Sequence, residues 1–251
     1  MYQSVPTAFP LRQPTFQFLQ ALAENNSKTW FDEQRQRYQF EVVTPIRNLI
    51  ESLAPFLTKL NPDLDVSYRV NTTVMRINRD RRFAPTSPPY RTYIKVSFPI
   101  RGRKWSEDPV FGFGIFPNYF YVAFRNAGKQ RKSFIQQYAH NLTAHQQLFE
   151  QWLECCQVSQ KLAFLGGEHD AIEVLSPCSP AFEDWRQHLE PTVGQVWTWE
   201  KLRQAEGLSL NQVVDLLVRL YFLKLMALSD NLEQDADHYF TVVRELCSSS
   251  I

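Results

Sequence analysis

The chain has 251 residues, of which 44% are hydrophobic and 14% aromatic, so it can bury the core of one large domain or of two smaller ones, and disorder is excluded as its main state. Its 27 Lys and Arg residues nearly balance 26 Asp and Glu residues, and a pI of about 7.7 is not that of a typical nucleic-acid-binding domain. No apolar run is long enough to span a membrane, and the first residues lack the basic flank and apolar core of a secretion signal, so we expect a cytoplasmic protein.

The N-terminal third is predicted to form three helices. Pro14 precedes an apolar stripe at helical spacing that stops at Asn25-Asn26, since Asn tolerates the left-handed conformation at a helix end. Ser27 can cap a second helix, and Thr44-Pro45 places a cap and a first-turn proline before a third. We expect the third helix to stop at Asn61-Pro62.

From about residue 66 the hydrophobic period changes to that of strands. Residues 90–100 alternate apolar and polar side chains, which is typical of a strand with one buried face. Residues 110–116 and 119–124 flank Pro117-Asn118, and this pattern predicts a hairpin with the turn at those two residues.

Two glycines of the hairpin, Gly112 and Gly114, lie on the same face of its first strand. Their missing side chains permit another backbone or a ligand to approach closely. We favour the structural explanation, a close backbone approach, over a ligand.

After Gly128 the helical period returns. Residues 134–156 keep helical spacing over six turns. Ser209 and Gln212 form a capping box before another helix, and a last helix runs through residues 239–246.

Helices, then antiparallel strands, then helices again predict an α+β fold. In it, an antiparallel sheet over about residues 66–126 is packed by N-terminal and C-terminal helices. The glycine- and proline-containing segment 165–180 is a candidate linker. We therefore expect an α+β core over residues 1–165 and a helical C-terminal unit over residues 166–251, either packed on the core or part of a single domain with it.

Positive charge is concentrated in residues 69–104, which hold ten Lys and Arg residues and a single acid, Asp80. Arg76, Arg79 and Arg82 recur there at every third residue. We expect the strand to break near Asn78, so that the last two arginines lie on a loop stiffened by prolines. Because guanidinium groups grip oxyanions in a bidentate fork, the cluster indicates an anionic partner.

The candidate anion-binding residues are Arg76, Arg79, Arg82 and Arg91. Asp80 is expected to orient the guanidinium groups, because a carboxylate beside so many cations has a lowered pKa and suits a charge partner better than a general acid. Phe83 and Tyr90 would anchor the loop. An internal ion-pair network is an equal alternative to a ligand site.

Three functions follow from these residues. The leading hypothesis is a module that binds a small anion or a phosphorylated metabolite. The second is a hydrolase or transferase on a phosphorylated or acidic substrate, which needs a base or nucleophile beside the arginines. The third is a nucleic-acid or protein adaptor, since Arg91 and Lys95 would lie about 13 Å apart on one strand face, a spacing that can follow a phosphate backbone.

No cofactor or metal is predicted. The glycine patterns of phosphate and dinucleotide sites are missing, and so is a nucleophile elbow. The four cysteines form no CxxC pair, which favours reduced thiols over a zinc site. Glu168-His169-Asp170 has metal-binding residue types, but three consecutive ligands rarely close a site. His140 and His145 are five residues apart, not the four of a zinc helix.

The arginine cluster has the form RxxRDxRF from Arg76 to Phe83, with Tyr90 following. Upstream stand FLxxL from Phe18 and NNxxxWF from Asn25. The upstream motif, made of FLxxL and NNxxxWF, followed by the arginine motif resembles the signature of an uncharacterised, mainly bacterial family, the domain of unknown function 2461 family. The resemblance covers roughly residues 14–125. It implies an α+β fold and no established activity, substrate or cofactor.

Overall fold

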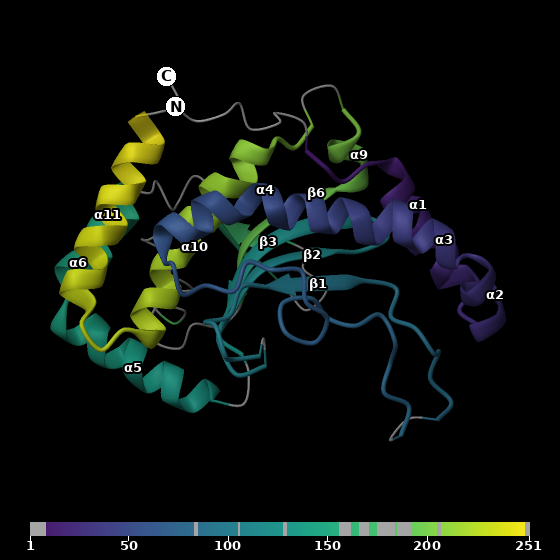
Figure 1. Ribbon diagram of the computed structural model, residues 1–251. Coiled ribbons are helices and arrows are strands. Elements are labelled where there is room, and N and C mark those ends of the chain that lie inside the picture. Colours follow the sequence, from purple (N-terminus) through teal and green to yellow (C-terminus); the bar gives the residue numbers. More distant parts are fainter. Residues whose placement is uncertain are drawn as a thin grey trace.

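A computed structural model describes residues 9–82, 85–104, 106–127, 130–155, 162–165, 171–174, 184, 192–204 and 207–248. Their fold is α+β, as predicted. A six-stranded antiparallel sheet has the strand order β1-β2-β3-β6-β4-β5, and helices from both parts of the chain surround it (Figure 1). The strands are β1 Ile94–Ser97, β2 Val110–Ile115, β3 Tyr119–Arg125, β4 Ala163–Leu165, β5 Ala171–Val174 and β6 Thr192–Thr198.

The predicted hairpin is confirmed, because β2 and β3 pair antiparallel around residues 116–118. The strand predicted over residues 90–100 is regular only over β1. Three strands, β4 to β6, lie beyond residue 126, so the sheet extends past its expected limit. The strand β5 lies inside the segment proposed as a linker.

The N-terminal helices are α1 Gln13–Glu24, α2 Lys28–Glu33, α3 Arg35–Arg37, the π-helix η1 Tyr38–Val43 and α4 Thr44–Leu60. The Ser27 cap is confirmed, since its hydroxyl accepts from the Trp30 N–H at 3.3 Å. The predicted cap at Thr44 is wrong. The backbone is already helical at Val43, and η1 runs directly into α4.

The C-terminal helices are α5 Arg131–Ala144, α6 Gln146–Cys155, α9 Trp199–Leu202, α10 Leu210–Leu228 and α11 Leu232–Ser248. The capping box of Ser209 and Gln212 is confirmed at the start of α10. The helix predicted over residues 134–156 is instead two helices, because the backbone leaves the helical conformation at His145. Periodicity alone does not detect this break, since the apolar spacing continues across it.

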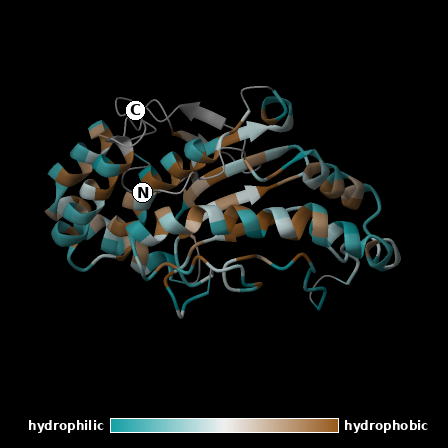
Figure 2. Ribbon diagram, turned by 45° about the horizontal axis from the view of Figure 1, so that its top comes forward, coloured by the Kyte–Doolittle hydropathy of each residue, from teal (hydrophilic) through white to brown (hydrophobic). Residues whose placement is uncertain are grey.

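One face of the sheet packs against α10, which in turn packs against α4, α5 and α11. The phenylalanines of this face, such as Phe98, Phe111 and Phe124, are fully buried, and Phe111 meets Tyr221 of α10 edge to face. Nearly every residue of α10 is buried, as expected for a helix that is hydrophobic on all sides. Figure 2 shows brown, hydrophobic residues concentrated in the strands and teal residues along the outer helices.

A buried ion pair joins α10 to the segment that leads into β2. The Lys224 Nζ of α10 lies 3.0 Å from an Asp108 carboxylate oxygen, and both side chains are shielded from solvent. Asp108 also accepts from the Ile100 N–H at 2.7 Å and from Arg103 at 2.9 Å. Burial alone would raise the pKa of Asp108, but Lys224 and the other donors outweigh it and hold this pKa below its usual range.

The part of the chain beyond residue 165 therefore contributes both to the sheet, through β6, and to the core, through α10. The boundary at residue 165 stays a prediction. Within the described residues, no helix combines the length and apolar character that crossing a membrane requires.

Candidate functional site

The arginine loop, residues 76–91, is closed by its own backbone. The Arg79 N–H donates to the Pro89 carbonyl at 2.9 Å, and the Arg91 N–H donates to the Ile77 carbonyl at 2.7 Å. Asn78 and Tyr90 form an antiparallel bridge between these bonds. The loop is therefore held at its base like a short hairpin.

Tyr90 and Asn26 fasten this loop to the N-terminal helices. The Tyr90 ring is buried and stacks on Phe31 with centroids 4.1 Å apart. The Asn26 side chain accepts from the Tyr90 N–H and donates to the Tyr90 carbonyl, both at 3.0 Å. Asn26 belongs to the upstream motif and Tyr90 follows the downstream one, so the two motifs meet in space.

Asp80 is paired within the loop. Arg82 binds it through two nitrogens, with Nε 3.0 Å from one carboxylate oxygen and a terminal nitrogen 2.5 Å from the other. Arg76 lies 3.9 Å away on the same carboxylate. Hydrogen bonds from Arg82, with the charges of Arg82 and Arg76, hold the pKa of Asp80 far below its usual range. An acid with so low a pKa is a charge partner and not a proton donor at neutral pH.

The other two predicted anion-binding arginines donate to loop carbonyls. Arg79 Nε donates to the Tyr90 carbonyl at 3.1 Å. Arg91 donates to the Arg76 carbonyl at 3.0 Å and also to the Asn78 carbonyl. Each of the four guanidinium groups thus contacts an acceptor of its own loop. Phe83 lies outside the described residues.

A shallow hollow lies beside the loop. Its lining brings Arg79 together with Lys28 and with Arg81, which was not among the predicted site residues. The two terminal nitrogens of Arg79 make no hydrogen bond with the described part of the chain. No carboxylate is among the described residues that line the hollow, which are Asn26, Ser27, Lys28, Asn78, Arg79, Arg81, Pro89 and Tyr90.

A second candidate is a cavity of about 380 Å³ on the face of the sheet that α10 does not cover. One row of paired residues runs across five strands, every member is small, and Ser97, Gly112 and Ala123 of this row line the cavity. The row is Ser97, Gly112, Ala123, Gly194 and Ala163. Because residues paired across a sheet share a face, the row forms a trough between larger side chains.

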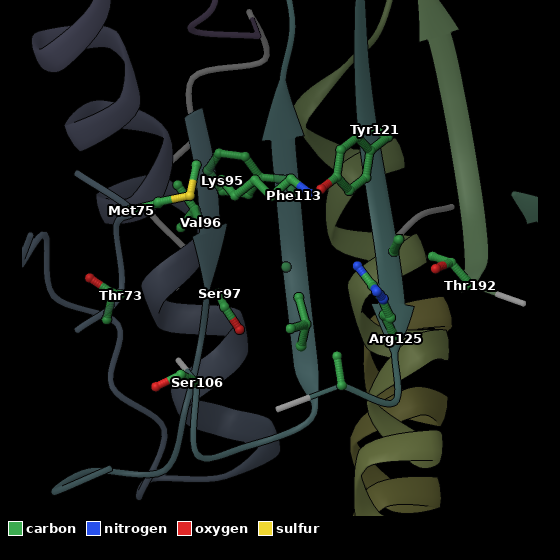
Figure 3. Close-up of a pocket in the computed structure, with 14 residues that line it drawn as sticks. Thr73, Met75, Lys95, Val96, Ser97, Ser106, Phe113, Tyr121, Arg125 and Thr192 are labelled. Carbon is green, nitrogen blue, oxygen red and sulfur yellow. The ribbon is translucent and has the colours of Figure 1, made fainter. Parts of the chain in front are cut away.

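A parallel row borders this trough. Lys95 of β1 pairs with Gly114 of β2, and Gly114 pairs with Tyr121 of β3. A Cβ atom at Gly114 would overlap the Tyr121 ring, so the glycine makes room for that ring. Figure 3 shows Lys95 reaching from β1 toward Tyr121 of β3, with Arg125 at the end of β3 and Thr192 at the start of β6.

The described polar side chains of the cavity are cationic or neutral. Lys95 and Arg125 carry positive charge, and Thr73, Ser97, Ser106, Tyr121 and Thr192 carry hydroxyl groups. No carboxylate lines it among the residues that the structure describes. Burial, and then the neighbouring Arg125, lower the pKa of the Lys95 amine, while burial raises the pKa of the Tyr121 hydroxyl.

The sequence singles out Gly112 and Gly114 but not the cavity, which Gly112 lines. From the sequence, Lys95 is predicted only as a phosphate contact beside Arg91, and no motif includes Arg125. The period-two pattern places Lys95 and Ser97 on one face of β1, and this was the available signal. Gly194 and Ala163 carry no such signal, because the pairing of Gly194 with β3 and of Ala163 with β6 is set only by the folded sheet.

The other candidates are the residues of metal-binding type. Glu168-His169-Asp170 lies outside the described residues. Across the described ranges, no three His, Cys, Asp or Glu side chains are placed to hold a metal ion. His145 contacts Glu233 at 3.6 Å, in a separate surface hollow.

The fold and the cavity together define an α+β protein built on a single antiparallel sheet, with a cationic cavity on one face. A family model, described as a conserved hypothetical protein (DUF2461), matches residues 14–169. The chain therefore belongs to this family of conserved hypothetical proteins. No curated protein and no solved structure matches it. The matched segment includes the upstream motif, the arginine motif and the three cavity residues Lys95, Tyr121 and Arg125.

Proposed function

We propose that this protein binds a small organic anion, and that the cavity beside β1, β2 and β3 is its binding site. The observation that carries the proposal is the pairing of two cations, Lys95 and Arg125, with a mostly apolar lining and no described carboxylate. A cation without an acidic partner in a sheltered site attracts an anionic ligand. At the arginine loop, by contrast, Asp80 already neutralises part of the charge.

The geometry favours a ligand with an acidic group and a compact apolar body. Arg125 offers the planar donor fork that matches a carboxylate or phosphate. The trough floor of glycine, alanine and serine accommodates an apolar body against the sheet. A volume of about 380 Å³ lies in the range of pockets for small metabolites.

Ligand-dependent thermal unfolding tests this proposal. The panel contains monocarboxylates, dicarboxylates and phosphate monoesters, with matched neutral amides and alcohols. We expect acids to raise the melting temperature and the neutral analogues to have no effect, since binding to the native state stabilises it. Arg125→Gln should lose this response. Arg101→Gln, at an exposed arginine outside the cavity, is the control that keeps it. If no acid of the panel raises the melting temperature of the wild type, the proposal is contradicted.

The hollow beside the arginine loop is a second candidate for an anion. It is favoured by the three cations Lys28, Arg79 and Arg81, again without a described carboxylate in the lining. Its openness to solvent suits an inorganic oxyanion or phosphate group more than an apolar ligand. Phosphate-dependent unfolding of Arg79→Gln, compared with Arg125→Gln, assigns the response to one site or the other.

A further inference from the structure

We infer that Lys95 is a covalent nucleophile, whose amine condenses with the carbonyl group of a small oxo acid to form an imine. This inference rests on the proposed binding of an organic anion in the same cavity and names the class of that anion. A 2-oxo acid has both groups that the site addresses, a carboxylate for Arg125 and an adjacent carbonyl carbon for Lys95.

The first support is the placement of the amine. Lys95 is half-buried and lines the cavity from β1. Its row partner Gly114 has no side chain, so nothing from β2 separates Lys95 from Tyr121 in that row. Figure 3 shows the two side chains directed toward one another across β2. An amine and a phenol are thus held side by side.

The second support is a comparison with the other buried lysine, Lys224. Lys224 is committed to Asp108, which accepts from it at 3.0 Å. Among the described residues, Lys95 has no carboxylate partner. Those around it are the rings of Tyr93 and Phe116, at 5.4 and 5.9 Å from its nitrogen, and the side chains of Tyr121 and Arg125. Tyr119 in turn stacks on the Phe116 ring.

The electrostatics favour a reactive amine. Burial is the larger cause that lowers the pKa of Lys95, and the charge of Arg125 is the second. The aromatic rings act in the opposite direction, because cation–π contact favours the ammonium form. The net direction is downward, which increases the share of neutral amine at physiological pH. Desolvation and a neighbouring cation are the two means by which proteins activate lysine for imine formation.

The reaction balances without an oxidant or reductant. The neutral Lys95 nitrogen attacks the carbonyl carbon, and the resulting carbinolamine loses its hydroxyl group as water. The Tyr121 hydroxyl donates the proton that this leaving group needs and regains one from the nitrogen. Burial keeps Tyr121 protonated, since it raises the pKa of that hydroxyl. One amine and one carbonyl give one C=N bond and one water molecule.

The experiment is reductive trapping. The full chain is incubated with pyruvate as the probe, treated with borohydride, and analysed by intact mass and peptide mapping. We expect a single adduct at Lys95, which adds the mass of pyruvate less one oxygen atom. The exposed Lys104 is the internal reference for non-specific modification. Equal labelling of Lys95 and Lys104, or no labelling of Lys95 by pyruvate and two larger 2-oxo acids, overturns the inference.

Two variants test the amine and the phenol separately. Lys95→Arg keeps the positive charge but has no amine that can condense with a carbonyl group, so it should form no adduct. Tyr121→Phe should trap pyruvate about a hundredfold more slowly, the size expected for loss of a general acid. Binding of lactate, a carboxylate without the carbonyl group, to the wild type measures binding without the covalent step. Lactate binding without trapping in the wild type leaves the proposed function standing and refutes the imine. Failure of lactate and pyruvate alike to bind or to be trapped refutes the imine, and failure of every acid of the panel to bind refutes the proposed function as well.

Discussion

The arginine loop and the cavity on the sheet differ in how their cations are partnered, and this difference matters more than the number of charges. The loop contains more arginines, but Arg82 is bound to Asp80, and Arg91 and Arg79 donate to backbone carbonyls. The cavity contains two cations and no described acid. A guanidinium that is already bound to its own chain has less to gain from a ligand.

Lys224 and Lys95 repeat the same contrast at single residues. Both are lysines whose pKa is lowered mainly by burial. Lys224 has a carboxylate partner and holds α10 against the sheet, whereas Lys95 faces aromatic rings and a second cation. The first lysine stabilises the fold, and the second is the nucleophile that we propose.

The largest change in the free energy of unfolding is expected at the buried ion pair of Lys224 and Asp108. Lys224→Met removes one partner and leaves Asp108 buried with a weaker set of donors, which should lower the free energy of unfolding by about 3–5 kcal/mol. Lys95→Met should leave the free energy of unfolding unchanged or raise it, because no carboxylate loses a partner. Urea denaturation of both variants measures the difference. Equal losses in the two variants would remove the distinction between them.

The ion pair of Lys224 and Asp108 also predicts that the free energy of unfolding depends on pH. The pKa of Asp108 is lower in the folded protein than in the unfolded chain, so the unfolded chain takes up the proton first as the pH falls. The stability from Asp108 is therefore complete above the unfolded pKa of about 3.9 and is lost as the pH falls through the folded value. Urea midpoints at decreasing pH should show a weaker acid dependence in Asp108→Asn than in the wild type.

The junction between the two motifs is expected to have the next largest effect. Asn26→Ala removes both hydrogen bonds to the Tyr90 backbone, whose groups are left without their partner. We expect a loss of about 2 kcal/mol in the free energy of unfolding. Asn25→Ala is the matched control, because the Asn25 side chain bonds only within its own helix, to the Ala21 carbonyl. A similar loss in both variants would indicate a general helix effect instead of a junction.

Filling the trough should affect ligand binding while the loop stays intact. Ala123 is the central member of the row of small residues, and Ala123→Leu places a branched side chain over the floor. We expect at least a tenfold loss of affinity for an organic acid, about 1.4 kcal/mol. Calorimetry with the best acid of the panel measures this loss. Undiminished affinity would place the ligand elsewhere, with the hollow at Arg79 as the next site to test.

The smallest effect is expected at the pair of Arg82 and Asp80. Arg82 is 79% exposed, and exposed ion pairs are screened by solvent. Arg82→Gln should therefore leave both the melting temperature and the binding of organic acids close to those of the wild type. A clear loss of anion response in this variant would restore the arginine loop as the binding site.

The amino-acid sequence alone determined the elements that depend on neighbouring residues. The Ser27 cap, the capping box of Ser209 and Gln212, and the hairpin around Pro117-Asn118 were all predicted, because each depends on hydrogen bonds or dihedral angles within a few residues. The two family motifs were also visible as strings. The short strands β4 and β5 were missed, since a few residues carry too little period to be distinguished from a loop.

Only the tertiary structure decided which side chains meet. The arginines of the loop bind backbone carbonyls and the Asp80 carboxylate, and counting charges in the sequence does not show these contacts. The trough depends on the register of five strands, and a shift of one residue would turn Gly112, Ala123 and Gly194 to the opposite face. Lys95 and Tyr121 are 26 positions apart in the chain and share a row only because Gly114 lies between them. Long-range pairing of this kind is set by the packing of the whole sheet, and local sequence does not encode it.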